Sequence, residues 1–189
     1  IRILQVDAFT STPFAGNPAA VAIADGGNLA SWPADAALQS LALEMNLSET
    51  AFPRRRPDGH WDLRWFTPAT EVDLCGHATL ATAHALFQLG LVDGTEITFH
   101  ARSGPLVCRA APAGGAIVMD FPRAEAEPCG PVDGLAEALG AEVVDQGRSF
   151  DLVAQLTSPD VVAALQPDFS ALARIDTRAV VVTAAGDVD

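Results

Sequence analysis

The sequence contains no lysine, because all eleven basic residues are arginine. The chain therefore lacks the amine that forms a Schiff base with pyridoxal phosphate and the lysine of a phosphate-binding loop. Acidic residues outnumber basic residues by 24 to 11, which gives a net charge of -13 and a pI near 4.4. Such acidity opposes binding to nucleic acid or to an anionic membrane, since affinity for phosphates comes largely from Lys and Arg.

Long apolar runs and paired cysteines are absent as well. No stretch approaches the roughly 20 uninterrupted apolar residues that a bilayer span requires, and residues 1–7 read as a strand rather than a secretion signal. The three cysteines are odd in number and widely spaced, which favours reduced thiols over disulfides. Asp73-x-Cys75-x-His77 has no second ligand pair nearby, so we expect no metal ion. These absences predict a cytoplasmic protein.

Hydrophobic periodicity predicts a mixed α+β fold for residues 1–122. One helix is expected over about 34–46, and a second, over about 78–89, is apolar around nearly its whole circumference. Because an all-apolar helix has to be surrounded, we expect a curved, mostly antiparallel sheet wrapped around it. The strands expected to form that sheet lie at 1–10, 19–24, 49–54, 60–66, 71–74, 96–101, 105–110 and 116–121.

Beyond residue 122 the composition changes to Ala, Glu and Pro, which indicates a linker through Gly130-Pro131. The pattern then resumes with a helix (132–139), strands (142–147 and 151–156), a helix capped by Ser158, a short helical segment (170–174) and a strand (179–183). We expect residues 123–189 to form a partial second domain of the same type. It has too few strands to enclose a helix, so the chain is expected to be a fragment or a truncated form.

Four motifs, in this order and spacing, resemble the N-terminal domain of PhzF-like proteins of phenazine biosynthesis. They are Gln5-Val6-Asp7-Ala8-Phe9 with Gly16-Asn17-Pro18-Ala19-Ala20-Val21, Met45-Asn46-Leu47-Ser48-Glu49-Thr50-Ala51-Phe52, Leu63-Arg64-Trp65-Phe66-Thr67-Pro68, and Asp73-Leu74-Cys75-Gly76-His77-Ala78-Thr79-Leu80. The resemblance implies a diaminopimelate-epimerase-like fold, in which two similar domains hold the active site between them. It also implies a homodimer and an isomerase that needs no cofactor and acts on a small molecule.

The resemblance further implies that Glu49 is the catalytic acid/base and that His77 lines the active site. Without the motif, Glu49 is most simply interpreted as a solvent-facing glutamate at a strand end. His77 fits a structural role as a helix-cap residue as well as it fits a role in an active site. In the motif, Glu49 would move a proton between carbons of a carboxylate-bearing metabolite. Cys75 and the backbone N–H groups of Gly76 and Ala78 would help bind a substrate anion ahead of the helix, and Asn17 would bind a polar group of the substrate.

Two alternatives remain open on the sequence. The Cys75-Gly76-His77 stretch is also similar to the first catalytic loop of cysteine-based racemases and epimerases, in which a thiolate removes an α-proton. Such enzymes need a second cysteine, and the remaining candidate, Cys129, lies in the expected linker, which argues for glutamate chemistry. If the truncation is natural, the chain would instead be a non-catalytic binding module.

Overall fold

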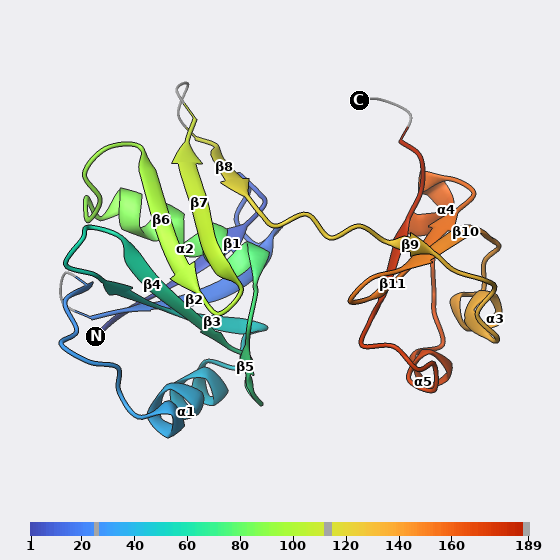
Figure 1. Cartoon of the computed structure of the whole chain (residues 1–189), viewed down its shortest axis with the longest axis horizontal. Helices are drawn as coiled ribbons and strands as arrows, with labels where there is room; N and C mark the ends of the chain where they lie inside the picture. The colour runs from blue at the N-terminus through green and yellow to red at the C-terminus, as the bar shows by residue number, and fades with distance from the viewer. Residues whose placement is uncertain (25–26, 112–114, 187–189) are drawn as a thin grey trace. The chain divides into compact units, whose positions relative to one another are not determined.

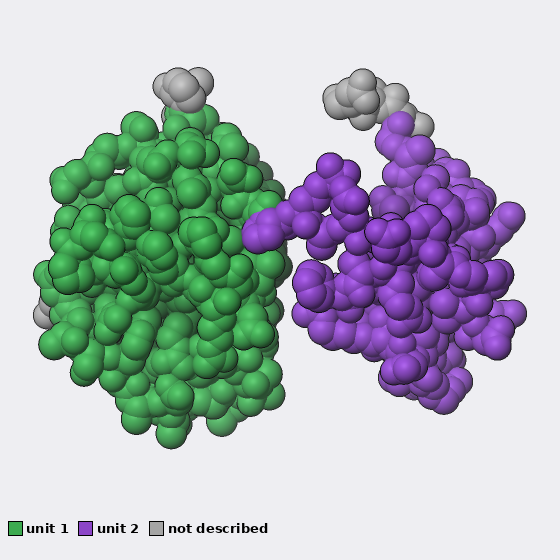
Figure 2. Space-filling view, in the orientation of Figure 1, with its two compact units in different colours: residues 1–121 green, residues 122–189 purple. Residues whose placement is uncertain are grey.

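A computed structural model describes residues 1–24, 27–111 and 115–186 of the chain. Within it the chain divides into two compact units, Ile1–Phe121 and Pro122–Asp189, which Figure 2 distinguishes by colour. No helix of the described residues is long and apolar enough to cross a membrane. Each unit has a hydrophobic core of its own, so each is described separately.

The first unit is built on one curved sheet of eight strands, in the order β1-β2-β3-β4-β6-β7-β8 with β5 paired to β4 (Figure 1). Every neighbouring pair is antiparallel except β2–β3 and β4–β6. The expected mostly antiparallel, curved sheet is therefore confirmed. Its strands are β1 (Arg2–Ala8), β2 (Asn17–Ile23), β3 (Glu49–Arg55), β4 (Trp61–Phe66), β5 (Glu71–Val72), β6 (Glu96–Ala101), β7 (Gly104–Ala110) and β8 (Ile117–Asp120).

Helix α2 (Gly76–Gln88) lies in the concavity of this sheet, as the apolar pattern predicts (Figure 1). Alanines that cover several sides of the helix are fully buried, and the strands contribute Trp61, Trp65 and Phe99 to the same core. Small alanines allow the helix to approach the sheet closely, while the large aromatic residues fill the space between strands. Among the residues of α2, His84 and Gln88 are exposed.

Helix α2 begins two residues earlier than the sequence analysis expected. Gly76 and His77 belong to its first turn, and Cys75, in extended conformation, is the N-cap. The error has a physical cause: glycine is a poor helix former and no Ser, Thr, Asp or Asn marks the cap, so the pattern alone predicts a later start. The correction moves His77 from a preceding turn onto the helix itself.

Helix α1 (Asp35–Met45) packs on the other side of β3 and β4, where Leu38 and Ala42 meet Phe52 and Phe66. The helix ends at Asn46, whose left-handed backbone (φ 50°) turns the chain. This turn delivers Ser48 and Glu49 to the start of β3, so the end of α1 sets where the glutamate enters the sheet.

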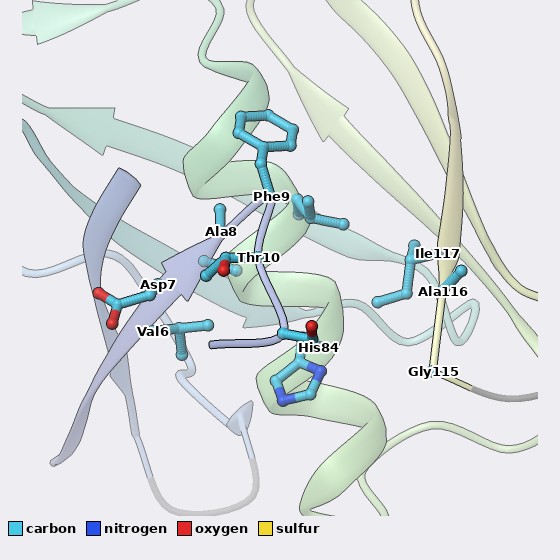
Figure 3. Close-up of a pocket in the computed structure, with 12 residues that line it drawn as sticks. Val6, Asp7, Ala8, Phe9, Thr10, His84, Gly115, Ala116 and Ile117 are labelled. Carbon is cyan, nitrogen blue, oxygen red and sulfur yellow. The ribbon is translucent and has the colours of Figure 1, made fainter. Parts of the chain in front are cut away.

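A hollow of about 430 Å³ lies where the end of β1 and the following loop meet α2 and the start of β8 (Figure 3). Strands β1 and β8 are the two ends of the sheet path, so the hollow marks the seam that the curved sheet leaves over α2. Thr10 and His84 are among its lining residues. Neither Glu49 nor His77 lines it, so this hollow is separate from the candidate site.

The second unit carries a sheet of four strands in the order β12-β11-β10-β9, with three short helices. Strand β9 corrects the expected linker, because it pairs with β10 and leads into Cys129, whose N–H donates to the Gln146 carbonyl. Ser158 caps α4 as expected, but that helix ends at Ala163 rather than Gln166. The elements are β9 (Glu127–Pro128), α3 (Leu135–Leu139), β10 (Val143–Arg148), β11 (Leu152–Leu156), α4 (Pro159–Ala163), α5 (Phe169–Leu172) and β12 (Val180–Thr183).

Gly16, in the turn before β2, is held against the chain that leaves β1. A Cβ at this position would meet the Ala8 carbonyl and lie 2.6 Å from Thr10 Cγ2. We expect Gly16→Ala to lower the free energy of unfolding by about 1–3 kcal/mol through overpacking, measured by urea denaturation. Gly76→Ala is the control, because a Cβ at Gly76 meets no heavy atom within 4 Å. Equal stability of the two variants would contradict the expectation.

Candidate active site

The candidate site lies where β2, β3 and α2 begin. Strands β2 and β3 run parallel, with Ala19 opposite Glu49, so both strands start at the same edge of the sheet. Asn17 is the first residue of β2 and Glu49 the first of β3. The first turn of α2 carries His77 to the same edge. Three elements that are far apart in the sequence thus supply one cluster of polar side chains.

His77 is the centre of this cluster. Its Nε2 atom lies 3.2 Å from Glu49 Oε2 and 3.2 Å from Ser48 Oγ, and its Nδ1 atom lies 3.4 Å from Cys75 Sγ. The imidazole is 9% exposed, so few water molecules compete for these contacts. The ring therefore links the thiol of the helix cap to the carboxylate of β3.

Glu49 presents a carboxylate that is only 18% exposed. Its Oε2 atom is buried and, among the described residues, receives no aligned hydrogen bond, although His77 Nε2 is at ion-pair distance. The two findings agree if the N–H of His77 points partly away from the carboxylate. A buried carboxylate oxygen without a donor is uncommon, and it leaves lone pairs free to take a proton.

Cys75 is a thiol rather than a thiolate in this site. Burial raises the pKa of Cys75 to about 12; the backbone N–H groups of Ala78 and His77 oppose the rise, whereas the negative charge of Glu49 and a hydrogen bond with its carboxylate add to it. A group with such a pKa is protonated at neutral pH. The thiolate chemistry of the cysteine-based alternative is thus disfavoured by the surroundings of the sulfur.

The predicted backbone contributors, Gly76 and Ala78, both lie in the first turn of α2. Backbone N–H groups of a first helical turn have no partner within the helix and face outward with the positive end of the helix dipole. The space beside Gly76 is open, since a Cβ there would meet nothing within 4 Å. The first turn of α2 is therefore not covered by neighbouring atoms beside Gly76.

Asn17 and Ser48 complete the exposed side of the cluster. Ser48 Oγ lies 3.5 Å from Asn17 Oδ1 and 3.4 Å from the Pro18 carbonyl, in addition to its contact with His77. Asn17 was predicted from the sequence as a substrate-binding residue, whereas Ser48 was not. Its position directly before Glu49 in the same motif was the signal available, because a residue that precedes a strand start shares its edge.

Three ligand atoms, one each from Glu49, Cys75 and His77, lie within 4.8 Å of one another and offer the oxygen, sulfur and nitrogen that Zn²⁺ accepts. The ring, however, turns one nitrogen toward the sulfur and the other toward the carboxylate. A metal ion would bind a single nitrogen, so the ring would have to move. The present arrangement is one of hydrogen bonding, and the expected absence of a metal stays a prediction.

The raised pKa of Cys75 leads to a labelling prediction. Cys75 and Cys108 are buried, and burial raises both pKa values to about 12, whereas Cys129 is partly exposed. Relative to a thiol with the ordinary value of 9.0, the thiolate fraction falls on the order of a thousandfold. We expect iodoacetamide to label Cys129 in the native protein, and the other two thiols only after denaturation, as read by peptide mass spectrometry. Rapid native labelling of Cys75 would restore the thiolate alternative.

The chain is similar in sequence to proteins of one family. A model of the PhzC-PhzF family, phenazine biosynthesis-like protein, matches residues 6–188. An uncharacterized isomerase of Pseudomonas aeruginosa is 47% identical over 185 residues, which cover 97% of this chain and 68% of that protein. The chain thus spans about two thirds of the length of this relative.

Solved structures agree with the observed fold. A phenazine biosynthesis protein of the PhzF family from Enterococcus faecalis superposes with a TM-score of 0.87 at 40% identity, covering 98% of this chain and 69% of that chain. A probable proline racemase from Agrobacterium radiobacter superposes with a TM-score of 0.57 at 12% identity, covering 85% and 52%. The second similarity concerns the fold alone, and it confirms the expected relation to the racemase and epimerase folds.

Proposed function

The chain belongs to the PhzC-PhzF family of phenazine biosynthesis-like proteins, and from this premise we propose that it carries the proton-transfer site of an isomerase. The substrate is a small carboxylate-bearing metabolite, and Glu49 is the acid/base that moves the proton. The observation that carries the proposal is the buried Glu49 Oε2, which lacks an aligned donor and lies 3.2 Å from His77 Nε2. A base needs a free lone pair, and this oxygen has one.

The proposed step moves one proton and no electrons to or from the enzyme. Glu49 takes a proton from a carbon between a carbonyl or carboxyl group and a carbon–carbon double bond. The electron pair of the broken C–H bond forms a new C=C bond, and the carbonyl π pair moves onto the oxygen, which gives a conjugated enolate. Glu49 then returns the proton to a different carbon, and the enolate collapses to the isomeric product. The carboxylate is regenerated, so the cycle requires no cofactor.

The first turn of α2 supports the charged intermediate. The first-turn N–H group of Gly76 and the positive end of the helix dipole favour negative charge at this place, while the Ala78 N–H also faces Cys75 Sγ. His77 is within reach of both Glu49 and a ligand in the open space beside Gly76. Fixed donors of this kind stabilise an oxyanion without reorganising during the reaction. Asn17, which is exposed at the edge of the cluster, would form a hydrogen bond with a polar group of the substrate.

The racemase alternative would require Cys75 to remove the proton. At neutral pH its protonated thiol, whose pKa is raised by burial to about 12, is a poor base. Glu49 lies in the same cluster with its lone pairs available. The chemistry of the site therefore favours the carboxylate over the thiol.

The proposal is tested by solvent exchange. The full-length protein, freed of metals and cofactors, is incubated in deuterated water with unsaturated or cyclic carboxylic acids, and products are analysed by mass spectrometry and NMR. The expected result is a double-bond shift with deuterium at the carbon that receives the proton. Turnover that depends on an added cofactor, or isomerisation in a form whose Glu49 carboxyl has been removed, would refute the proposal.

A further inference from the structure

Cys75 is a buried side chain at the centre of the site that the proposed proton transfer does not use. The residue is 8% exposed, and its Sγ lies 3.4 Å from His77 Nδ1. A neutral imidazole carries one N–H and one lone pair, so a group this close to a ring nitrogen helps to decide which nitrogen bears the proton. The choice matters because the other nitrogen faces Glu49.

The neighbours of the ring distinguish the two tautomers. With the proton on Nε2, the N–H is directed at Ser48 Oγ and lies beside Glu49 Oε2, each 3.2 Å from the nitrogen, while Nδ1 accepts a hydrogen bond from the thiol. With the proton on Nδ1, the Nε2 lone pair faces a buried carboxylate oxygen, which repels it. Ser48 is compatible with the first tautomer, because its own hydroxyl can donate to the Pro18 carbonyl at 3.4 Å.

We propose that Cys75 is a positioning residue, whose S–H donates to Nδ1 of His77 and holds the imidazole in the Nε2–H tautomer. An N–H group then lies beside Glu49 and is available to the substrate. The role requires a protonated thiol, and burial, which raises the pKa of Cys75 to about 12, ensures that it is protonated. The inference rests on the proposed function for its catalytic meaning, but the tautomer itself does not depend on any activity.

The tautomer gives His77 a defined part in the reaction. In the resting site the Nε2–H lies beside the negative carboxylate of Glu49. When Glu49 takes the substrate proton, its charge disappears and the enolate oxygen becomes the negative group nearby. The same N–H then donates to that oxygen, and no proton leaves the ring. The opposite tautomer would present a lone pair to the oxyanion and destabilise it.

The tautomer is read directly by NMR of the ¹⁵N-labelled full-length protein, since protonated and unprotonated ring nitrogens have distinct chemical shifts. We expect the Nε2–H form for His77 in the wild type and a shift toward a mixture of forms in Cys75→Ala. Cys108→Ala is the matched control, because Cys108 is also buried, on β7, and burial alone raises its pKa to about 12. It should leave the His77 signals unchanged.

A hydroxyl can replace the thiol as hydrogen-bond donor, so Cys75→Ser should keep the Nε2–H form. This variant also tests the inference if Cys75→Ala does not fold. In the exchange assay, Cys75→Ala should lower kcat by roughly ten- to a hundredfold, the range found for residues that orient a metal-bound histidine, with KM little changed and partial recovery in Cys75→Ser. Retention of the wild-type tautomer in Cys75→Ala, or its loss in Cys75→Ser, would overturn the inference. Absence of exchange in the wild type would refute the proposed function instead, and the NMR result would still decide the role of Cys75.

Discussion

Glu49→Gln is expected to lower the rate of solvent deuterium incorporation by about 10²–10⁴-fold, the contribution of a positioned general acid/base. Glutamine has nearly the same shape and remains in contact with His77, so the fold and the substrate-binding groups are kept. It has no basic lone pair to take the proton and no acidic proton to return. We expect kcat to fall while KM changes little, because the groups proposed to bind the substrate lie in the first turn of α2 and are unchanged.

The control for this variant is Glu96→Gln. Both glutamates are the first residue of a strand in the same sheet, but Glu96 is half-exposed on β6 and pairs with Arg109. Its replacement removes one exposed ion pair, which contributes little to stability, and leaves the candidate site intact. Equal activity of the two variants would show that Glu49 is not the proton carrier, provided that circular dichroism shows both to be folded.

Most of the fold of the first unit could be predicted from the sequence. An all-apolar helix flanked by strands has few ways to bury itself, so the curved sheet around α2 follows from residues such as Ala81, Ala83 and Leu86. The exact helix start did not follow. Residues 76 and 77 have a weak helix signal of their own, and the packing of α2 inside the sheet decides their conformation.

The site was predictable only in part, for a related reason. The motifs indicated Glu49 and His77 separately, but their 3.2 Å contact depends on where β3 and α2 begin in three dimensions. Ser48 and the contact of Cys75 with Nδ1 were not predicted, because each arises only when elements from different parts of the chain meet. Side-chain hydrogen bonds between distant residues carry little signal in a single sequence, whereas hydrophobic periodicity is local and repeated.

Strand β9 illustrates the same limit in the second unit. Its segment is rich in Glu and Pro, which is typical of a linker, yet Glu127 and Pro128 pair with β10. A proline is tolerated at the edge of a sheet, where its missing N–H costs no ladder bond. The pairing is set by β10, which offers its free edge, and not by the propensity of the segment.

The largest expected effect on stability comes from placing a charge in the centre of the first unit. Ala83 lies on α2 and is fully buried in the core of the curved sheet. Ala83→Asp would add volume to a packed core and bury a carboxylate without a partner. We expect this change to cost more than about 5 kcal/mol, which is as large as the whole free energy of unfolding of a marginally stable domain. We expect the first unit to be unfolded at 25 °C, as shown by loss of near-ultraviolet circular dichroism.

His84→Asp separates the effect of burial from that of the aspartate itself. His84 is the next residue on the same helix and is exposed, so the carboxylate stays in water and the expected change in stability is within about 1 kcal/mol. Hydrogen exchange followed by mass spectrometry should localise the damage in Ala83→Asp. Peptides from residues 1–121 are expected to lose protection, while those of the second core, around Leu135, Leu152 and Leu156, keep it. Loss of protection in both units would mean that the second core forms only when the first is folded, and a melting temperature equal to that of His84→Asp would place Ala83 outside the core.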